Sequence, residues 1–302
     1  MYLKPILFSL IIFSFYSLSY GKNLALSFDD GLNPTINPRA QQINNDLLYH
    51  LSSHDIKSII FPSYIKIGDI EGKQLIKQWG DQNHLIGNHS AFHQNLNKDH
   101  VTTTEYIQSI KINEAIFSNL PNFTYLYRFP FLKEGNTIEK RMAIHNWLIA
   151  NNYKNGAVSI DASDWFYNLK YLEYTNIHDT KKLELLKQAY ISHLLDRAQY
   201  YDNLAIQTIG RSPKHVLLLH TNDINAAFLN DVITAFKNNK WDFVSASEAF
   251  NDPIYNEFSQ NIPAGESIIW SIAKSKKIPN LRYPAEDAPY ETENLKKYQL
   301  HD

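Results

Sequence analysis

The sequence predicts an α/β fold, most simply a distorted (β/α) barrel of about seven parallel strands. Short apolar or β-branched runs alternate with longer amphipathic segments along most of the 302 residues. Such alternation is typical of parallel strands that are connected by helices. The series is unbroken, which favours a barrel over an open sheet. In barrels of this kind the reactive groups come from the carboxyl ends of the strands.

Each expected strand is followed by an expected helix, except the last. The strand segments are Leu24–Phe28, Lys57–Phe61, His84–Gly87, Tyr125–Phe129, Ala157–Ile160, His215–His220 and Trp241–Ser245. The helical segments have a period of 3.6 residues. They are Gln41–Ser53, Gly72–Gln82, Thr103–Asn119, Thr137–Asn151, Lys181–Tyr201 and Ile224–Asn239.

Three segments lie outside this pattern. Residues 1–21 have the features of a secretory signal peptide, with Lys4 before an apolar run, and an uncleaved membrane anchor is the alternative. The protein is therefore expected to be exported, as a periplasmic or secreted protein. Residues 22–250 form the main domain, with an insertion at about 166–211 whose aromatic start would form a wall or lid over the rim. Residues 251–302 are expected to pack on the barrel as an irregular extension.

Composition excludes several classes of function. The formal net charge is −2 without a basic block, so nucleic acid, which needs a positive footprint, is not an expected partner. The chain has no cysteine, which excludes disulfides, thiolate nucleophiles and cysteine metal sites. It also lacks the Gly-x-Ser-x-Gly elbow of many serine hydrolases. Any metal ion must therefore be held by His, Asp or Glu side chains.

Residues with acid–base or metal-binding chemistry follow the ends of the expected strands. They are Asp29, Asp30, His89, His93, Arg128, Asp161, Asp164 and His220. Because the carboxyl ends of parallel strands share one rim, these side chains are expected to lie together. An ordinary solvated Asp-Asp-Gly turn is the alternative for the first pair, since Asp-Gly is a common turn signal.

The histidine pair predicts a metal site. His89 and His93 are four residues apart, and on a helical turn both rings would face one ion. Asp30 is the natural third, anionic ligand. Two His and one Asp leave a position open for water, which is the arrangement of a hydrolytic centre. One divalent ion is therefore expected; Zn²⁺ suits these ligands, and Co²⁺ or Ni²⁺ fits them too.

Hydrolysis also needs groups that accept and donate protons. Asp29 lies beside Asp30 and is a candidate base for the attacking water. His220 is a candidate acid for the leaving group, provided that a carboxylate such as Asp164 orients its ring and supports its protonated form.

Five motifs in order resemble those of the polysaccharide deacetylases, the family built on the NodB homology domain (carbohydrate esterase family 4). They are Ser27–Gly31, His89–His93, Arg128–Phe131, Asp161–Trp165 and Leu218–His220. The resemblance implies a NodB-like barrel and metal-dependent removal of N-acetyl, or O-acetyl, groups from a sugar polymer. Ser27 stands where Thr is more usual, and Phe131 where Tyr is common.

The resemblance also implies a role for each motif residue. Asp29 would be the general base, held by Arg128, and His220 the general acid, tuned by Asp164. The metal ligands would be Asp30, His89 and His93. The three substrate-binding residues would be Phe131 through its backbone N–H, which would stabilise the oxyanion, and Trp165 and Leu218 around the acetyl methyl. The resemblance does not extend to the insertion or to residues 251–302.

Three functions are compatible with these motifs. The favoured one is an enzyme, a deacetylase of a cell-wall or extracellular polysaccharide such as an N-acetylglucosamine polymer, peptidoglycan or acetylated xylan. The second is a catalytically silent glycan-binding protein of the same fold, which would have no need of Asp29 or His220. The third is a hydrolase of another small amide or a cyclic imide. A membrane would be contacted only through an uncleaved signal segment.

Overall fold

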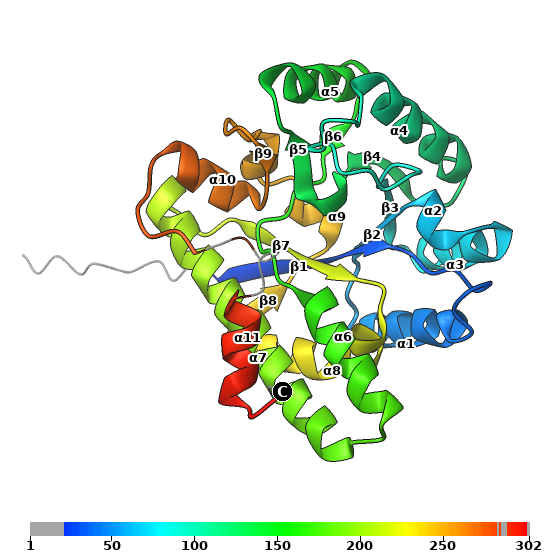
Figure 1. Cartoon of the computed structure of the whole chain (residues 1–302), viewed down its shortest axis with the longest axis vertical. Coiled ribbons are helices and arrows are strands. Elements are labelled where there is room, and N and C mark those ends of the chain that lie inside the picture. The colour runs from blue at the N-terminus through cyan, green and yellow to red at the C-terminus, as the bar shows by residue number, and fades with distance from the viewer. Residues whose placement is uncertain (1–20, 283, 285–288, 301–302) are drawn as a thin grey trace, which may run out of the picture.

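A seven-stranded sheet organises the protein (Figure 1). The computed structural model describes residues 21–282, 284 and 289–300. The strand order is β6-β4-β3-β2-β1-β7, β8 also pairs with β1, and every pairing is parallel. The strands are β1 (Lys22–Asp30), β2 (Ile59–Pro62), β3 (Leu85–Asn88), β4 (Phe123–Tyr127), β6 (Lys154–Asn155), β7 (Lys214–His220) and β8 (Trp241–Phe243). The predicted α/β class with a parallel sheet is confirmed.

A short segment, residues 154–160, closes the curled sheet into a distorted barrel. Its first residues form β6 and pair with β4, and Ile160 pairs with Leu217 on β7. Ile160 donates a hydrogen bond to Val216 O, and Leu218 donates one to Ile160 O, both at 3.1 Å. The expected strand Ala157–Ile160 is therefore not a regular strand. The closing segment pairs with β4 at Lys154–Asn155 and with β7 at Ile160, and it connects these two strands.

The closing segment passes close to the centre of the barrel because it carries a glycine there. A Cβ atom at Gly156 would lie 2.7 Å from the ring of Phe61, which no real side chain tolerates. Gly156 N–H donates to Tyr127 O at 2.6 Å. The absence of a side chain thus lets the chain cross from β4 toward β7 over the buried ring.

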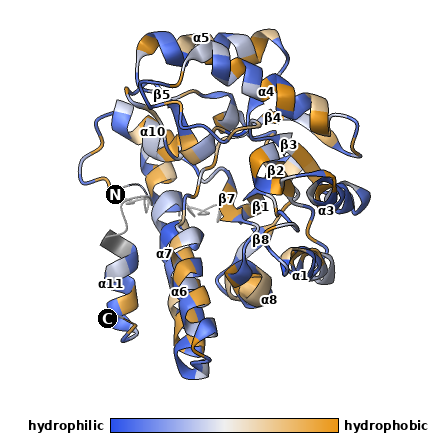
Figure 2. Cartoon of the chain, turned by 45° about the vertical axis from the view of Figure 1, so that its right-hand side comes forward, coloured by the Kyte–Doolittle hydropathy of each residue, from blue (hydrophilic) through white to orange (hydrophobic). Residues whose placement is uncertain are grey.

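Helices cover the sheet (Figures 1 and 2). They are α1 (Ala40–Ser53), α2 (Tyr64–Ile67), α3 (Ile70–Asp81), α4 (Thr103–Phe117), α5 (Ile138–Ala150), α6 (Asp164–Asn176), α7 (Thr180–Ile209), α8 (Asp223–Asn238), α9 (Ala246–Ala249), α10 (Ile268–Ser275) and α11 (Pro289–Lys297). Two 3₁₀ turns, η1 (Pro130–Leu132) and η2 (Pro253–Asn256), and an antiparallel pair, β5 (Lys133–Gly135) with β9 (Ala264–Gly265), complete the elements. No helix in the described part of the chain is long and apolar enough to cross a membrane.

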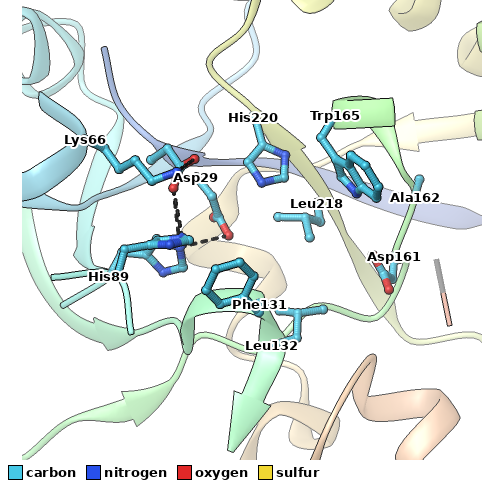
Figure 3. A pocket seen from close by; sticks show the side chains of 12 residues that line it. Asp29, Lys66, His89, Phe131, Leu132, Asp161, Ala162, Trp165, Leu218 and His220 are labelled. Atoms are coloured by element: carbon cyan, nitrogen blue, oxygen red, sulfur yellow. Dashed lines mark hydrogen bonds and ion pairs between the residues drawn. The ribbon is translucent and has the colours of Figure 1, made fainter. Parts of the chain in front are cut away.

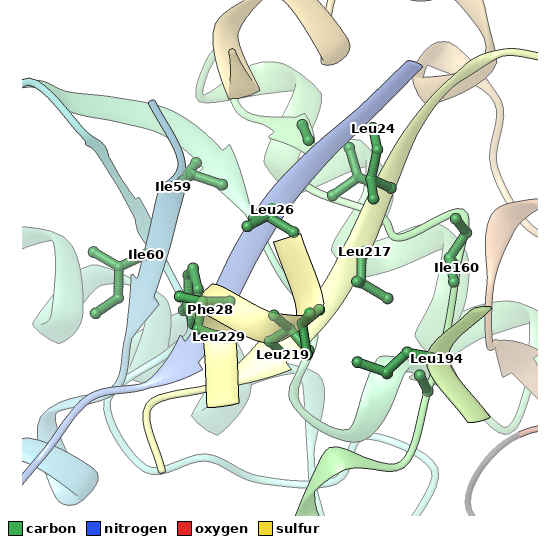
Figure 4. Close-up of a cluster of buried hydrophobic side chains, with 14 of the residues drawn as sticks. Leu24, Leu26, Phe28, Ile59, Ile60, Ile160, Leu194, Leu217, Leu219 and Leu229 are labelled. Carbon is green, nitrogen blue, oxygen red and sulfur yellow. The ribbon is translucent and has the colours of Figure 1, made fainter. Parts of the chain in front are cut away.

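The core lies between the central strands and the helices (Figure 4). Leu24, Leu26 and Phe28 of β1 are fully buried on the side that faces the helices. Ser27 and Asp29 alternate with them and contact Arg128 in the barrel interior. Both faces of β1 are therefore covered, which explains why its sequence is an almost continuous apolar run.

The two segments outside the barrel pattern are more regular than predicted. The insertion forms most of α6 and all of α7, and its Tyr167 and Tyr174 are fully buried in the core. It is thus part of the helical layer. The tail is not irregular, since it contains η2, β9, α10 and α11, and Ile268 N–H at the start of α10 donates to Val158 O at 2.9 Å. The predicted signal peptide lies in residues 1–20, outside the described residues.

The closing segment generates a test of stability. The buried hydroxyl of Ser159 accepts a hydrogen bond from Val216 N–H at 2.8 Å. Ser159→Ala leaves this N–H without its partner, which costs about 1–3 kcal/mol. We expect urea titrations to show that loss in the free energy of unfolding. Ser53→Ala, which removes an exposed hydroxyl on α1, should change it by less than about 0.5 kcal/mol; equal changes in both variants would contradict the prediction.

Candidate active site

One cavity of about 420 Å³ lies at the carboxyl ends of the central strands (Figure 3). Its walls come from β1, α2, the loops after β3 and β4, the segment before α6, and the end of β7. The lining residues are Asp29, Asp30, Lys66, His89, His93, Phe131, Leu132, Asp161, Ala162, Trp165, Leu218 and His220. Eight of the ten predicted site residues are among them. The other two, Arg128 and Asp164, are fully buried and bind lining residues from behind.

The two carboxylates at the end of β1 reach the same cavity because the backbone turns between them. Side chains alternate along a strand, so neighbours in a continuing strand would point to opposite faces. Asp30 has φ +82° and Gly31 has φ +89°, in the left-handed region that ends the strand. A Cβ at Gly31 would lie 2.6 Å from Ile67 Cγ2, so glycine is required at this turn.

Asp29 is fixed in one orientation by a buried arginine. Arg128 Nη1 donates to Asp29 Oδ1 at 2.9 Å, Nη2 donates to Ser27 Oγ at 3.2 Å, and Nε donates to Gly156 O. The guanidinium also lies over the ring of Phe61, 4.3 Å from its centroid. Burial raises the pKa of Asp29, and the charge of Arg128 offsets part of that rise. Asp29 is therefore an oriented carboxylate that is more basic than one in water.

Asp30 and the two histidines face one another. Asp30 Oδ1 lies 3.1 Å from His93 Nε2 and 3.9 Å from His89 Nε2. One ligand atom from each of the three lies within 4.8 Å of the others. Asp30 Oδ1 is buried and accepts no hydrogen bond, and burying such an oxygen is costly unless it binds a donor or a cation.

The ring of His89 is held in the form that binds metals. His89 Nδ1 lies 2.8 Å from Arg128 O. A carbonyl only accepts, so Nδ1 carries the proton and Nε2 keeps its lone pair on the side of the two carboxylates, 3.6 Å from Asp29 Oδ2 and 3.9 Å from Asp30 Oδ1. Burial, with the neighbouring charge of His93, keeps the pKa of His89 well below its ordinary value. A neutral imidazole whose outer N–H binds a carbonyl is the usual state of a histidine ligand, so these three residues fit a divalent cation.

The histidines converge through a loop, and the predicted helical turn is wrong. Residues 89–95 form neither helix nor strand, and Ser90 and His93 have φ +56° and +48°. The loop is held by a neighbouring side chain and by a residue of α4. Asn88 Oδ1 accepts from Ser90 N–H at 2.9 Å, and Ser109 on α4 accepts from Ala91 N–H and Phe92 N–H at 3.0 Å.

His220 is held by a carboxylate at the start of α6. Asp164 Oδ1 lies 2.7 Å from His220 Nδ1. Asp164 Oδ2 accepts from His220 N–H at 2.7 Å, Asn222 Nδ2 at 2.9 Å and Asn225 Nδ2 at 2.7 Å. Burial alone would lower the pKa of His220, but the charge and hydrogen bond of Asp164, with smaller effects from the two carboxylates of β1, raise it to about 10. The imidazole is therefore protonated at neutral pH.

The backbone itself places the base candidate beside the acid candidate. Asp29 and His220 are partners in the parallel β1–β7 ladder. Neighbouring strands lie about 4.8 Å apart, and paired residues point to the same face. The two groups therefore flank one site at the end of the ladder.

The apolar wall of the cavity comes from three predicted residues. Phe131 has φ +56° within η1, and its ring packs edge-on against His93 with 4.6 Å between the ring centroids. Trp165 is 39% exposed at the start of α6, and Leu218 on β7 is buried. Figure 3 shows Phe131, Trp165 and Leu218 around the same space as His220 and Asp29.

Lys66 is a site residue that the sequence analysis missed. Its Nζ lies 3.0 Å from Asp30 Oδ2, so it occupies the carboxylate oxygen that is turned away from the histidines. Burial alone would raise the pKa of Asp30, but His93, His220 and Lys66 outweigh it and lower the pKa. Lys66 lies just after β2, and applying the strand-end rule to this strand would have found it.

A second polar cluster has the order of a serine-hydrolase triad but is closed. His215 Nδ1 lies 3.1 Å from Ser159 Oγ, and His215 Nε2 lies 3.2 Å from Asp202 Oδ1. All three are buried, and none of them lines the cavity. This cluster ties α7 and β7 to the closing segment, and we interpret it as structural.

Part of the chain is similar to a known protein family. Residues 19–147 match the family model described as polysaccharide deacetylase. This part of the chain is therefore similar to the polysaccharide deacetylase family. The matched segment contains Asp29, Asp30, the histidine pair and Arg128, but it ends before Asp164 and His220.

Two curated relatives are similar to about half of this chain. A peptidoglycan-N-acetylglucosamine deacetylase from Bacillus cereus is 29% identical over 154 residues, which are 50% of this chain and 49% of that protein. The peptidoglycan-N-acetylglucosamine deacetylase PgdA of Listeria monocytogenes is 27% identical over 146 residues, which are 48% of this chain and 27% of that protein. The chain thus spans about half the length of the first relative and about a quarter of the second.

Solved structures show the same fold. A polysaccharide deacetylase from Bacillus cereus superposes with a TM-score of 0.53 at 21% identity, covering 74% of this chain and 91% of that one. A pseudoenzyme of carbohydrate esterase family 4 from Bacillus anthracis gives a TM-score of 0.52 at 16% identity, covering 76% and 66%. The NodB-like fold is therefore confirmed. Because a pseudoenzyme shares it, activity has to be argued from the site.

Metal binding should depend on Asp30. Asp30→Ala removes the anionic ligand, so we expect the Zn²⁺ affinity to fall by more than about 100-fold, beyond the usual effect of outer-shell partners. Isothermal titration calorimetry of the metal-free protein measures this. Asp29→Asn is the matched control, since it alters the neighbouring carboxylate and should change the affinity by less than about tenfold. Wild-type affinity in Asp30→Ala would show that the ligands are misassigned.

The protonation of His220 can be measured without any substrate. In the metal-free protein its imidazole should stay charged to about pH 10, and Asp164→Asn should lower that pKa. Because the folded pKa exceeds the unfolded value of about 6.5, the pair stabilises the fold fully below about pH 6.5, and this contribution is lost as the pH rises toward 10. Histidine NMR titrations, assigned with His220→Gln, check the prediction. A wild-type resonance that titrates near pH 6.5 would contradict it.

Proposed function

We propose that this protein is a metal-dependent hydrolase that removes acetyl groups from a polysaccharide, with N-acetylglucosamine units of peptidoglycan as the first candidate substrate. The observation that carries the proposal is the content of one cavity: a metal-ligand triad, an oriented basic carboxylate and a protonated imidazole. The names of the two curated relatives support the substrate class. Acetylated xylan and other N-acetylglucosamine polymers are further candidates.

Asp30, His89 and His93 would hold the metal ion. Zn²⁺ is the first candidate, and Co²⁺ or Ni²⁺ fits the same donors. A divalent ion bound there would polarise the acetyl carbonyl and lower the pKa of a water molecule. Lys66 leaves Asp30 Oδ1 free to face the histidines, since it binds the other oxygen of that carboxylate.

Asp29 would act as the general base. It accepts the proton of the water that attacks the acetyl carbon, and its burial makes it a stronger base than an exposed carboxylate. Arg128 keeps the carboxylate pointing into the cavity. The backbone N–H of Phe131, at the cavity wall, would add a donor for the oxyanion, where one well-placed donor is worth about 3–4 kcal/mol.

His220 would act as the general acid. When the bond between the acetyl carbon and the sugar nitrogen breaks, the leaving amine needs a proton, and His220 supplies it. Asp164 prepares the residue for this step by raising its pKa and by fixing the ring through Nδ1. Nε2 is then the atom that carries the transferable proton.

The size and wall of the cavity suit a single acetylated sugar unit. Its volume of about 420 Å³ is at the lower end of ligand sites in proteins. Trp165 and Leu218 give it an apolar side for the acetyl methyl. Because peptidoglycan lies outside the cytoplasm, we also propose that residues 1–21 direct export to the periplasm or the medium.

A silent glycan-binding protein is the second candidate, because the fold is shared with a pseudoenzyme. The intact Asp29 and His220 favour catalysis over binding. A hydrolase of another small amide would use the same groups, and only the substrate would differ.

The zinc-loaded mature protein should release acetate from N-acetylglucosamine oligomers or peptidoglycan fragments, and EDTA should abolish the release. Asp29→Asn and His220→Ala should each lower kcat by at least about 100-fold, because each removes one proton transfer. A coupled acetate assay gives the rates. Zn²⁺ affinity, measured beside it, should stay near the wild-type value, whereas the melting temperature should fall, because each variant leaves a partner charge buried and unpaired.

Two outcomes would change the assignment. If metal-loaded protein releases no acetate from N-acetylglucosamine polymers, peptidoglycan or acetylated xylan, the deacetylase is rejected, and binding of the same glycans by calorimetry tests the silent binder. If Asp29→Asn stays active, the base is another group.

A further inference from the structure

The last described helix of the tail, α11, lies against α6 and α7 (Figure 1). Two polar side chains of α11, Glu291 and Asn294, are buried in this contact, and Glu291 has no solvent exposure. They are three residues apart and therefore share one face of the helix. Because a buried carboxylate is costly unless it is hydrogen-bonded, the partners of Glu291 indicate what the contact does.

Glu291 binds the residue that starts α6. Ser163 Oγ donates a hydrogen bond to Glu291 Oε1. Ser163 is the N-cap residue of α6, and its side chain makes no cap bond. A serine at this position ordinarily turns its hydroxyl to the first-turn N–H groups of its own helix. Here it is turned to the tail helix.

Asn294 binds α6 one turn further along. Its Nδ2 donates to Tyr167 Oη and to Ala189 O on α7, both at 2.8 Å. Ser163 and Tyr167 are four residues apart and lie on either side of Asp164 and Trp165 in the sequence. The tail helix thus contacts both ends of the turn that carries these two site residues.

Asp164 is consequently held from two sides. On the side of β7 and α8, its carboxylate accepts hydrogen bonds from His220, Asn222 and Asn225. On the side of the tail, Glu291 holds the preceding residue. His193 of α7, with Nε2 3.8 Å from Glu291 Oε1, is kept neutral because burial lowers its pKa to about 3. The buried guanidinium of Arg197 also lies within the field of Glu291.

We propose that Glu291 and Asn294 are positioning residues for the reaction: through Ser163 and Tyr167 they set the place of Asp164 and Trp165. Neither touches the cavity, and the kinetic part of this inference rests on the proposed function. A displacement of about 1 Å at catalytic groups lowers rates by about 100-fold. A helix near the C-terminal end thereby controls the acid side of a site whose base and metal ligands lie in the first third of the chain.

The experiment compares two glutamates of α11. Glu291→Leu removes the acceptor of Ser163, and Glu291→Gln keeps an acceptor of the same shape. Glu293→Gln is the matched control, since Glu293 is exposed on the same helix. We expect Glu291→Leu to lower kcat by at least about tenfold at unchanged Zn²⁺ affinity. The basic limb of its pH–rate profile should move to lower pH, because a displaced Asp164 supports the charged His220 less well. Glu291→Gln should recover most of the activity, and Glu293→Gln should match the wild type.

A second readout does not require activity. The indole N–H resonance of Trp165, assigned with Trp165→Phe, should shift in Glu291→Leu and Asn294→Ala and stay in place in Glu293→Gln. This result supports the inference even if no glycan is deacetylated, so the two proposals fail separately.

A purely structural tail gives a different pattern. In that case Glu291→Leu and Asn294→Ala would fold and melt at a lower temperature. Their kcat, pH profile and Trp165 resonance would be those of the wild type, and this result would overturn the inference. If Glu291→Leu does not fold, Ser163→Ala and Asn294→Ala remove the same two contacts with smaller changes. Unaltered kcat and resonance in both of these would overturn it equally.

Discussion

A buried ion pair at the centre of the barrel is the interaction on which the rest of the site depends. Arg128 has no solvent exposure, and its nitrogens bind Asp29, Ser27 and Gly156 while its face lies on Phe61. Removing two charges from water costs several kcal/mol per ion and is offset only when geometry and hydrogen bonds are good. Replacing Asp29 or Arg128 alone would therefore leave the other charge buried and unpaired. The pair joins the ends of β1 and β4 to the closing segment, and so sets the floor of the cavity.

Above this floor, two neighbouring carboxylates acquire different chemistry from their surroundings. Asp29 points to Arg128 in a dry interior, where burial raises its pKa. Asp30 turns away through a positive φ, toward two imidazoles and Lys66, which together lower its pKa against the effect of burial. Pairs of titratable groups whose environments separate their pKa values usually divide acid–base work between them. The division proposed here, a base beside a metal ligand, follows from one backbone turn.

Sequence patterns predicted the features that depend on local periodicity. Apolar runs located most of the strands, and the rule that reactive groups follow strand ends selected eight residues that lie in or behind one cavity. The resemblance added Phe131, Trp165 and Leu218, which line the same cavity. Lys66 was missed although it follows the end of β2, because the rule was not applied to that strand. The other features that were missed or wrong depend on tertiary contacts. The loop at His89–His93 is held by Ser109 on α4, and the tail helices pack through isolated buried residues. Such contacts join segments that no window of the sequence contains together.

The site is assembled from two parts of the chain, and their junction explains why the tail matters. The proposed base and metal ligands lie within the segment that matches the family model, whereas Asp164 and His220 lie beyond it. The backbone fixes the spacing between Asp29 and His220, because the two residues are partners in the β1–β7 ladder. The direction of the imidazole is a separate matter, since it is set by Asp164 at the first turn of α6. That turn packs against α11. Backbone pairing thus places the proposed acid, and the tail helix contacts the turn that orients its ring.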